Sequence, residues 1–285
     1  MKRSVLVTGA STGIGFATAQ MLTSAGYHVF GGVRRMVDAE RLSGEIGEEV
    51  TPLLLDVTDQ EAIADAAKDI SERLGTRTLA GLVNNAGIAT AGPLLHQPLD
   101  EIRRQMEVNV LAQVAVIQAF APLLGADRSR QGGPGRIVNI SSVAGRIAAP
   151  FVGAYAASKH AFEALSDALR RELMIYGIDV VIIEPGAVAT PIWDKAEAAD
   201  FMQYFRSDYR EQMTRLRALA LKQGRAGYPP ERIATSVLRA LTAARPPTRI
   251  PIVKGALANW IIPRVLPDRI LDRVVAKMMG LKRLG

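Results

Sequence analysis

A tyrosine and a lysine stand four residues apart in the segment Tyr155-Ala-Ala-Ser158-Lys159. If this segment is helical, the two side chains share one face, so the phenol and the ammonium point the same way. A free tyrosine has a pKa of about 10, and a nearby cation lowers that pKa because it stabilises the phenolate. The pair could then exchange a proton with a carbonyl or alcohol oxygen. The same spacing also fits an exposed surface pair, so its meaning depends on its surroundings.

Two polar positions could complete such a site. Ser141 and Ser142 end a predicted strand (residues 136–141) upstream of the tyrosine. Ligands bind at the carboxyl ends of strands in open α/β sheets, so a hydroxyl there could donate to a substrate oxygen. Asn109 lies in an otherwise apolar helical stretch. It could hold a water that connects Lys159 to solvent, or it could be an ordinary hydrogen-bonded core asparagine.

A glycine-rich segment, Thr8-Gly9-Ala10-Ser11-Thr12-Gly13-Ile14-Gly15, follows the first predicted strand. Glycine permits positive φ and close backbone approach. The free N–H groups and the dipole at the start of the next helix favour a pyrophosphate, although a plain strand-to-helix turn is the alternative. The first gap between glycines is one residue longer than in the common dinucleotide fingerprint.

Predicted strands and helices alternate along the chain. The expected strands are residues 4–8, 29–33, 50–55, 79–84, 136–141, 179–184 and 250–253. The expected helices are residues 14–25, 60–74, 99–124, 156–176 and 230–244. This order predicts a single α/β domain of Rossmann type, a doubly wound parallel sheet with helices on both faces. Residues 190–228 are expected to be helical, and residues 254–285 to form a helical C-terminal extension.

Composition narrows the classes of protein. The chain has no cysteine and three scattered histidines, so no metal site is expected. No apolar run reaches the roughly 20 residues that span a bilayer, and no secretory signal is seen, so a cytoplasmic protein is expected. The net charge is +7, and seven basic residues against two acids lie from Lys254 onward. Without a nucleic-acid motif this indicates a solvated basic face and no nucleic-acid partner.

Together these residues resemble the short-chain dehydrogenase/reductase family in its single-domain branch, from about Val5 to Thr190, with weaker likeness to about Val253. TGASTGIG, Asp56-Val57, NNAG from Asn84 and the segment from Pro185-Gly186 to Thr190 match its cofactor motifs. Asn109, Ser142, Tyr155 and Lys159 match its catalytic tetrad. The resemblance implies an NAD(P) cofactor, hydride exchange at a carbonyl or hydroxyl carbon, and a homodimer or homotetramer. It implies these cofactor-binding residues: Gly9, Ser11, Thr12, Gly13, Ile14, Gly15, Arg34, Arg35, Asp56, Val57, Asn85, Ala86, Gly87, Tyr155, Lys159, Pro185, Gly186, Val188 and Thr190.

The end of the second predicted strand bears on the choice of cofactor. NAD-selective enzymes of such folds place an acid there, which accepts hydrogen bonds from the adenosine ribose. Here the equivalent residue is Val33, and Arg34 and Arg35 follow it. Guanidinium groups suit a 2′-phosphate, so NADP(H) is the expected cofactor, with NAD(H) second. Thr12 departs from this pattern, because many NADP-preferring relatives carry a basic residue at that position.

The substrate is expected to be lipophilic. Within the family the chain looks most like the hydroxysteroid and retinol dehydrogenases, so a secondary alcohol or ketone of steroid, retinoid or lipid type is expected. Ser142, Tyr155 and Trp193 are the expected substrate-binding residues, under a lid of residues 190–228. The lid aromatics are Trp193, Phe201, Tyr204, Phe205 and Tyr209. A 3-oxoacyl thioester reductase is the alternative enzyme, and a non-catalytic NADP-binding regulator is the alternative from another class.

The C-terminal extension has an apolar helical stripe beside a basic one. The basic stripe contains Arg269, Arg273 and Lys277, one turn apart. The apolar stripe contains Ile270, Leu271, Val274, Val275, Met278 and Leu281. We expect this helix to pack over the substrate site or against a subunit partner, and peripheral membrane contact is the less favoured alternative.

Overall fold

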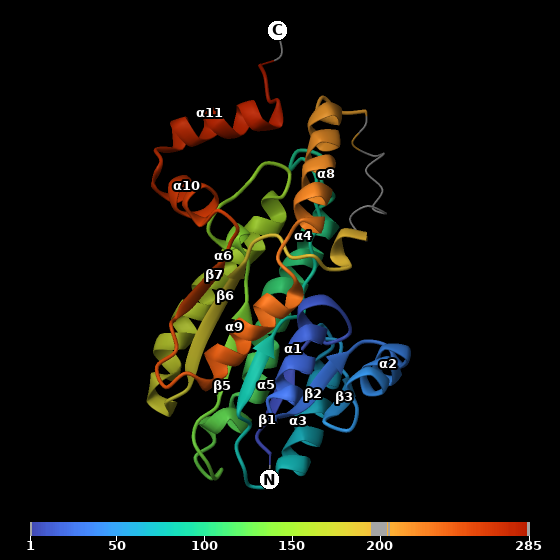
Figure 1. The fold of residues 1–285 in the computed structure, drawn as a ribbon, viewed down its shortest axis with the longest axis vertical. Coiled ribbons are helices and arrows are strands. Elements are labelled where there is room, and N and C mark those ends of the chain that lie inside the picture. Colours follow the sequence, from blue (N-terminus) through green and yellow to red (C-terminus); the bar gives the residue numbers. More distant parts are fainter. Residues whose placement is uncertain (1, 195–203, 205, 284–285) are drawn as a thin grey trace.

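Short runs rich in Val, Ile and Leu form the centre of the molecule. The computed structural model describes residues 2–194, 204 and 206–283. Within these residues one parallel sheet has the strand order β3-β2-β1-β4-β5-β6-β7 (Figure 1). The strands are β1 (Ser4–Val7), β2 (His28–Val33), β3 (Val50–Leu54), β4 (Gly81–Asn84), β5 (Arg136–Ile140), β6 (Asp179–Pro185) and β7 (Arg249–Ile252). Strands buried on both faces carry such continuous apolar runs because helices cover both sides. The predicted doubly wound sheet is confirmed.

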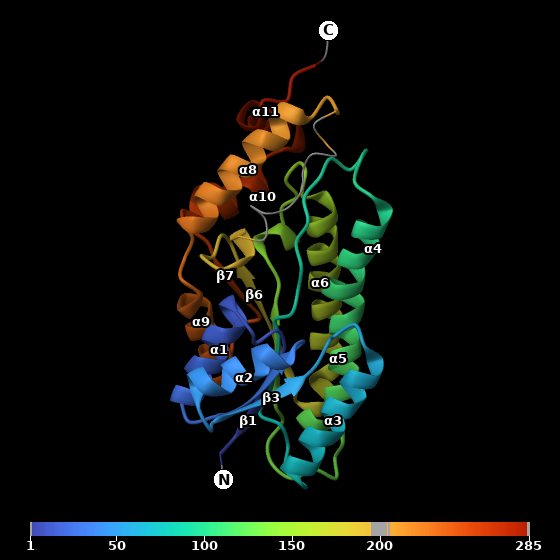
Figure 2. The ribbon, with the colours of Figure 1, turned by 90° about the vertical axis from the view of Figure 1, so that its right-hand side faces the viewer.

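Helices cover the two faces of the sheet (Figure 2). One layer contains α1 (Gly13–Ser24), α2 (Met36–Ile46) and α9 (Pro230–Thr242). The other contains α3 (Gln60–Leu74), α4 (Leu99–Met106), α5 (Ala112–Phe120) and α6 (Gly153–Glu172). Side chains alternate between the two cores along a strand. In β1, Val5 and Val7 belong to the core under α1 and α9, and Leu6 to the core under α3 and α5.

Two helical predictions need correction. No helix was expected between the second and third strands, where α2 lies; only Asp38, Ala39 and Leu42 of this helix are buried, so its apolar signal is weak. The expected uninterrupted helix 99–124 instead contains a π-helical turn at Glu107–Leu111, and the helical conformation is broken at Gly125, which has a φ of 114°. A π-helical turn accommodates an extra residue and is frequent at functional sites. Asn109 lies in this turn.

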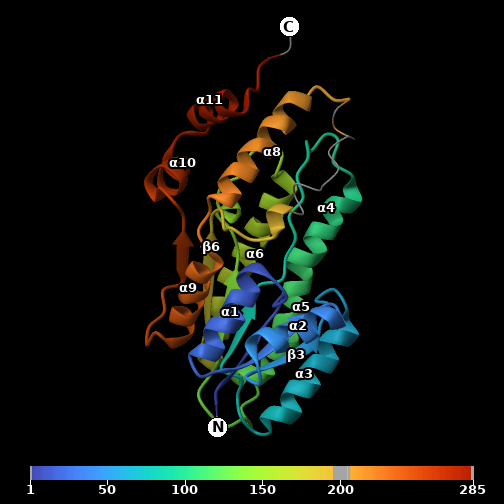
Figure 3. The same ribbon diagram turned by 45° about the vertical axis from the view of Figure 1, so that its right-hand side comes forward.

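The last helices lie beyond the carboxyl ends of the strands, at the top in Figures 1 and 3. They are α8 (Arg210–Arg225), α10 (Ile262–Val265) and α11 (Asp268–Met279). A small separate core joins them to the body of the protein through Phe151, Tyr204, Met213 and Met279. Phe201 and Phe205, two of the expected lid aromatics, lie outside the described residues. Among the described residues no helix is long and apolar enough to cross a bilayer.

Candidate active site

The glycine-rich turn between β1 and α1 has the conformation that its sequence predicts. Gly9 and Gly13 have φ of 64° and 58°, in the left-handed region that side chains disfavour. A Cβ on Gly15 would lie 2.1 Å from the Gly9 carbonyl oxygen, so only glycine fits there. Thr12 precedes α1 and makes no capping hydrogen bond through its side chain. The first N–H groups of α1 are therefore free to bind an anion such as a pyrophosphate.

The loop after β4 holds this turn in place. The Asn85 side chain donates to the carbonyl oxygens of Thr8 and Gly9, at 2.9 and 3.1 Å. The backbone N–H groups of Asn85 and Ala86 both donate to the Thr8 hydroxyl, at 3.0 and 3.1 Å. Two segments that are distant in the sequence thus form one rigid platform. Gly87 follows on this platform, and a Cβ there would lie 3.2 Å from Asn109 Oδ1 and 3.8 Å from Lys159 Nζ.

The segment after β6 closes over the other side of the turn. Pro185 is buried at the end of β6, and the Gly186 N–H donates to the Ile252 carbonyl of β7 at 3.0 Å. Val188 is buried, and Thr190 lies against Gly13, where a Cβ would meet its methyl group at 3.1 Å. The predicted residues of the nicotinamide side and the phosphate side therefore come together.

Asp56 and Val57 lie after β3, toward the adenine side expected from the resemblance. Val57 is buried, and Asp56 accepts hydrogen bonds from the Thr58 N–H and hydroxyl, at 3.0 and 2.8 Å. Burial alone would raise the pKa of Asp56. The Thr58 hydrogen bonds and the positive charges of Arg34 and Arg104 more than offset it, so the pKa lies below its ordinary value.

The end of β2 corrects part of the cofactor prediction. Arg34 is exposed, but Arg35 donates to both oxygens of Asp38, at 2.8 and 3.1 Å. Both arginines were expected to meet a 2′-phosphate, but Arg35 already has a partner in Asp38 of the same chain. Arg41 was not predicted, yet its guanidinium donates to the Ser11 carbonyl of the glycine turn and also contacts Asp38. The position of Arg41 beside the glycine turn could not be predicted, because no helix was expected at Met36–Ile46.

Ser142 and Tyr155 meet at the carboxyl end of β5. The Ser142 hydroxyl accepts from the Ala144 N–H at 3.1 Å and donates to the Pro185 carbonyl at 3.5 Å. Burial raises the pKa of Tyr155, and the nearby Ser142 hydroxyl opposes that rise without cancelling it. The expected lowering by Lys159 is not found, because the Lys159 ammonium donates to the Ile140 carbonyl at 3.0 Å. Tyr155 is therefore a protonated phenol at neutral pH.

Lys159 and Asn109 are buried behind this pair. Burial lowers the pKa of Lys159 to about 8, and the negative charge of Glu163 partly opposes the fall. The Asn109 amide donates to the Ile88 carbonyl at 2.9 Å and to Ser158 at 3.0 Å, and its oxygen accepts from the Ile88 N–H at 2.9 Å. The side chain is therefore used as a core asparagine, and its part in a proton relay stays a prediction.

An apolar cavity of about 270 Å³ opens near the carboxyl edge of the sheet. It is lined by Pro93, Leu94, Leu95, Pro150, Phe151, Tyr209 and Leu281. The rings of Tyr209 and Phe151 pack edge to face, with their centroids 5.6 Å apart. The backbone of Phe151 has a φ of 68°, which bulky residues rarely adopt. Trp193 does not line this cavity. Its indole N–H donates to the Val188 carbonyl at 2.7 Å and its ring packs against Gly224 of α8.

Comparisons with known proteins agree with this geometry. The family model for short chain dehydrogenases matches residues 3–200. The NADPH-dependent 3-dehydrocapnine reductase of Ornithobacterium rhinotracheale is 39% identical, over 99% of this chain and 98% of that protein. Retinol dehydrogenase 5 of Mus musculus is 35% identical, over 95% of this chain and 87% of that protein. The crystal structure of a short-chain dehydrogenase from Streptomyces avermitilis has a TM-score of 0.74 at 28% identity, covering 98% and 96% of the two chains.

Proposed function

Because the chain belongs to the short chain dehydrogenase family, as an oxidoreductase acting on CH–OH groups with NAD(P), we propose that it interconverts a lipophilic secondary alcohol and its ketone with NADP(H). The observation that carries the proposal is that the Ser142 hydroxyl and the Tyr155 phenol lie together at the carboxyl end of β5, close enough for Ser142 to lower the pKa of Tyr155. Lys159 lies one helical turn along α6. The clamped glycine turn lies across the same edge of the sheet, so a bound dinucleotide and a carbonyl could reach one another there.

The nicotinamide, when bound, supplies the hydride for reduction or accepts it in oxidation. For reduction, the Tyr155 hydroxyl donates its proton to the carbonyl oxygen as that oxygen gains negative charge. Ser142 orients the same oxygen by hydrogen bonding. Lys159 holds the ribose and stabilises the phenolate that Tyr155 leaves behind. Asn109 would serve a water relay that returns a proton from solvent to Lys159 and Tyr155, although its side chain already bonds Ile88 and Ser158.

Preference for NADP(H) is supported by charge at the end of β2. Arg34 is exposed and free to meet a 2′-phosphate, and Arg41 lies over the glycine turn at Ser11. Val33 offers no acceptor to the 2′-hydroxyl that NAD(H) carries. One relative bears NADPH in its name. NAD(H) is the second cofactor that the site could take, with lower efficiency.

A lipophilic substrate is supported by the apolar lining of the cavity. Leu94, Phe151 and Tyr209 are among its lining residues and offer carbon surface, and retinol dehydrogenase 5 is a relative. A 3-oxoacyl thioester reductase is the second candidate, because its core machinery would be the same. An intact set of Ser142, Tyr155 and Lys159 argues against a non-catalytic NADP-binding regulator.

The test is NADPH oxidation by the purified protein with ketones of increasing apolar size, and with matched 3-oxoacyl thioesters. Each buried methylene is worth up to about 0.8 kcal/mol, so kcat/KM should rise by up to about fourfold per methylene until the cavity is full. Equal efficiency on acetone-sized and steroid-sized ketones would contradict the lipophilic assignment. Higher efficiency on the thioesters would favour the second candidate.

The C-terminal extension is proposed to roof the substrate end and leave room for a subunit partner. Val275, Met279 and Leu281 pack with the lid helix α8, and Leu281 lines the apolar cavity. The long helices at residues 99–124 and 156–176 are the proposed surface of a homodimer or homotetramer. Contact with an anionic membrane is the less favoured use of the exposed basic stripe. Salt-sensitive co-sedimentation with anionic vesicles would reverse that order.

A further inference from the structure

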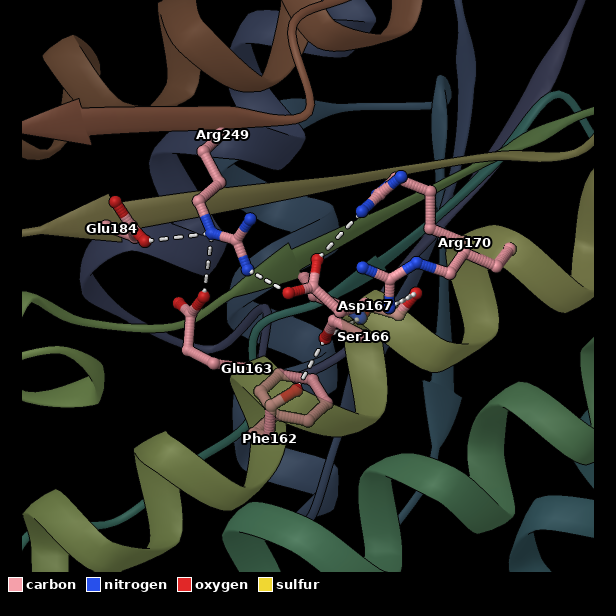
Figure 4. Close-up of polar contacts among 9 residues, drawn as sticks. Phe162, Glu163, Ser166, Asp167, Arg170, Glu184 and Arg249 are labelled. Carbon is pink, nitrogen blue, oxygen red and sulfur yellow. Dashed lines mark hydrogen bonds and ion pairs between the residues drawn. The ribbon is translucent and has the colours of Figure 1, made fainter.

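Three carboxylates converge on one arginine, Arg249 (Figure 4). Arg249, the first residue of β7, contacts Glu163 Oε2 through Nε at 3.1 Å and Glu184 Oε1 at 3.4 Å. Its Nη2 reaches Asp167 Oδ2 at 2.7 Å. Glu163 and Asp167 lie one turn apart on α6, whereas Glu184 comes from β6. None of these four groups has been assigned a role in the reaction, and two of them share helix α6 with Tyr155 and Lys159.

The cluster holds more negative charge than Arg249 can balance. Glu163 is 3% exposed and Glu184 is fully buried, so an unpaired charge on either is costly. Asp167 has a second partner, since Arg170 contacts it at 3.1 Å. Glu163 and Glu184 are left to share one guanidinium group. An acid pair in this situation takes up a proton.

Glu184 is the member that takes the proton. Burial and the negative charge of Glu163 raise the pKa of Glu184 to about 7, although Arg249 and Arg146 oppose the rise. A protonated Glu184 can donate to Glu163, and both residues have carboxyl oxygens with no other hydrogen-bond partner. The Glu163 carboxylate thus accepts from Arg249 on one side and from a protonated Glu184 on the other.

Glu163 stands directly behind the catalytic lysine. It lies four residues after Lys159 on α6, so the two side chains share a face. Gly145 of the loop after β5 packs on this face, because a Cβ there would lie 2.9 Å from Glu163 Cγ and 3.2 Å from the Lys159 carbonyl oxygen. Low dielectric strengthens the interaction of buried charges, and Lys159 and Glu163 are both buried. The charged groups around Glu163 are Lys159 and Asp167 from α6, Glu184 from β6 and Arg249 from β7, and Arg146 acts on Glu184.

We propose that Glu163 is a positioning residue for the reaction: its carboxylate, held by Arg249 one helical turn from Lys159, keeps the buried Lys159 ammonium charged. The inference rests on the role of Lys159 in the proposed function. A charged Lys159 is needed both to bind the ribose and to stabilise the Tyr155 phenolate. Without an anion behind it, the same burial would favour the neutral amine at the pH of the reaction.

The direct test is the titration of Lys159 in the cofactor-free protein, followed by NMR of 13C- and 15N-labelled lysine. Wild-type Lys159 should titrate with a midpoint of about 8. Glu163→Gln keeps the shape and removes the charge, so the midpoint should fall by about one pH unit or more. Glu163→Asp draws the carboxylate back by one methylene, so it should lower the midpoint in the same direction by a smaller amount. The Glu163→Asp variant therefore still tests the proposal if Glu163→Gln does not fold.

Asp167→Asn is the matched control. It removes an acid from the same helix and the same arginine, one turn farther from Lys159, so the midpoint should move by less than about 0.3 pH unit. A midpoint unmoved in both Glu163 variants would overturn the inference. An equal shift in Asp167→Asn would also overturn it, because the effect would then be one of overall charge.

Activity gives a second readout. With its Lys159 midpoint one unit lower, Glu163→Gln should lose about eightfold in kcat/KM at pH 8.5 and stay close to wild type at pH 6. A loss of equal size at both pH values would indicate damage to packing and count against the proposal. The lysine titration needs no substrate, so it separates the two hypotheses. A shifted midpoint in a protein that reduces no ketone would refute the proposed function alone.

Discussion

The cofactor end and the substrate end of this protein are held together in different ways. At the cofactor end the contacts involve backbone atoms: Gly15 packs on the backbone of Gly9, and the Asn85 side chain donates to the carbonyl oxygens of Thr8 and Gly9. At the substrate end, flexible side chains from α8 and α11 meet on Phe151, while large apolar residues such as Val274 stay exposed. Backbone contacts allow little variation in sequence, whereas side-chain contacts can be repacked. We therefore expect substitutions at the proposed cofactor end to impair the reaction itself, and substitutions at the proposed substrate end to alter specificity.

The largest effect is expected where the two ends meet, at Tyr155. Tyr155→Phe removes one hydroxyl, so folding and NADPH binding should be kept. Loss of a general acid and base costs roughly 10²- to 10⁴-fold in rate, and kcat for ketone reduction should fall accordingly. Steady-state kinetics would measure the loss, with cofactor binding followed by NADPH fluorescence.

Two results would contradict this assignment. A variant that keeps more than about a tenth of wild-type kcat would remove Tyr155 from the chemistry. A variant that loses NADPH binding to the same degree as kcat would place the tyrosine in the cofactor site only.

The conformation of the glycine turn and the placement of Tyr155 and Lys159 on one helix could be predicted from the sequence because their signals are local. The glycine turn is eight consecutive residues between a strand and a helix, and Tyr155 and Lys159 are four positions apart. Turn conformation and helix faces follow from such short spacings. The strand order then places these segments at one edge, as it does in open α/β sheets generally.

The cluster behind Lys159 could not be predicted in the same way. Glu163 and Arg249 are 86 residues apart, and they meet only because β7 pairs with β6 over α6. One signal was available: Glu184 is an acid at the end of an otherwise apolar buried strand. The Arg35–Asp38 pair was also within reach, being three residues apart, but the helix that brings them together was not expected.

A smaller effect is expected at the outer edge of the cofactor end. Arg34→Ala should erase most of the preference for NADPH over NADH by raising KM for NADPH alone. Hydrogen bonds to charged groups are worth about 1.5–3 kcal/mol, which corresponds to roughly 10- to 100-fold. Arg35→Ala is the matched control: its guanidinium is exposed and held by Asp38, so the preference should change by less than about threefold. Initial rates with both cofactors at fixed ketone would measure the effect.

This prediction has two ways to fail. Wild type could prefer NADH, which would mean that the end of β2 has been misinterpreted. Arg35→Ala could instead change the preference as much as Arg34→Ala does, which would mean that the Asp38 pair opens when the cofactor binds.

The smallest effect on overall stability is expected at the substrate end. Met279 of α11 is 4% exposed in the small core with Phe151, whereas Val274 on the same helix is 55% exposed. Because Met279 is buried in the small core, its replacement by alanine leaves a cavity, which should destabilise the local packing by roughly 2–5 kcal/mol. Because α11 contacts the body mainly through α8, we expect this cost to act on local opening and not on global unfolding. In Met279→Ala, hydrogen exchange of the α11 amides should accelerate by roughly tenfold or more, while the amides of β1 and β4 keep their rates.

Val274→Ala is the matched control. It should change the free energy of opening by no more than about 0.5 kcal/mol, so the exchange rates of α11 and of the two strands should change by no more than about twofold. If β1 and β4 also exchange faster in Met279→Ala, the extension shares the cooperative unit of the sheet, and the two ends are not held as separately as their contacts indicate.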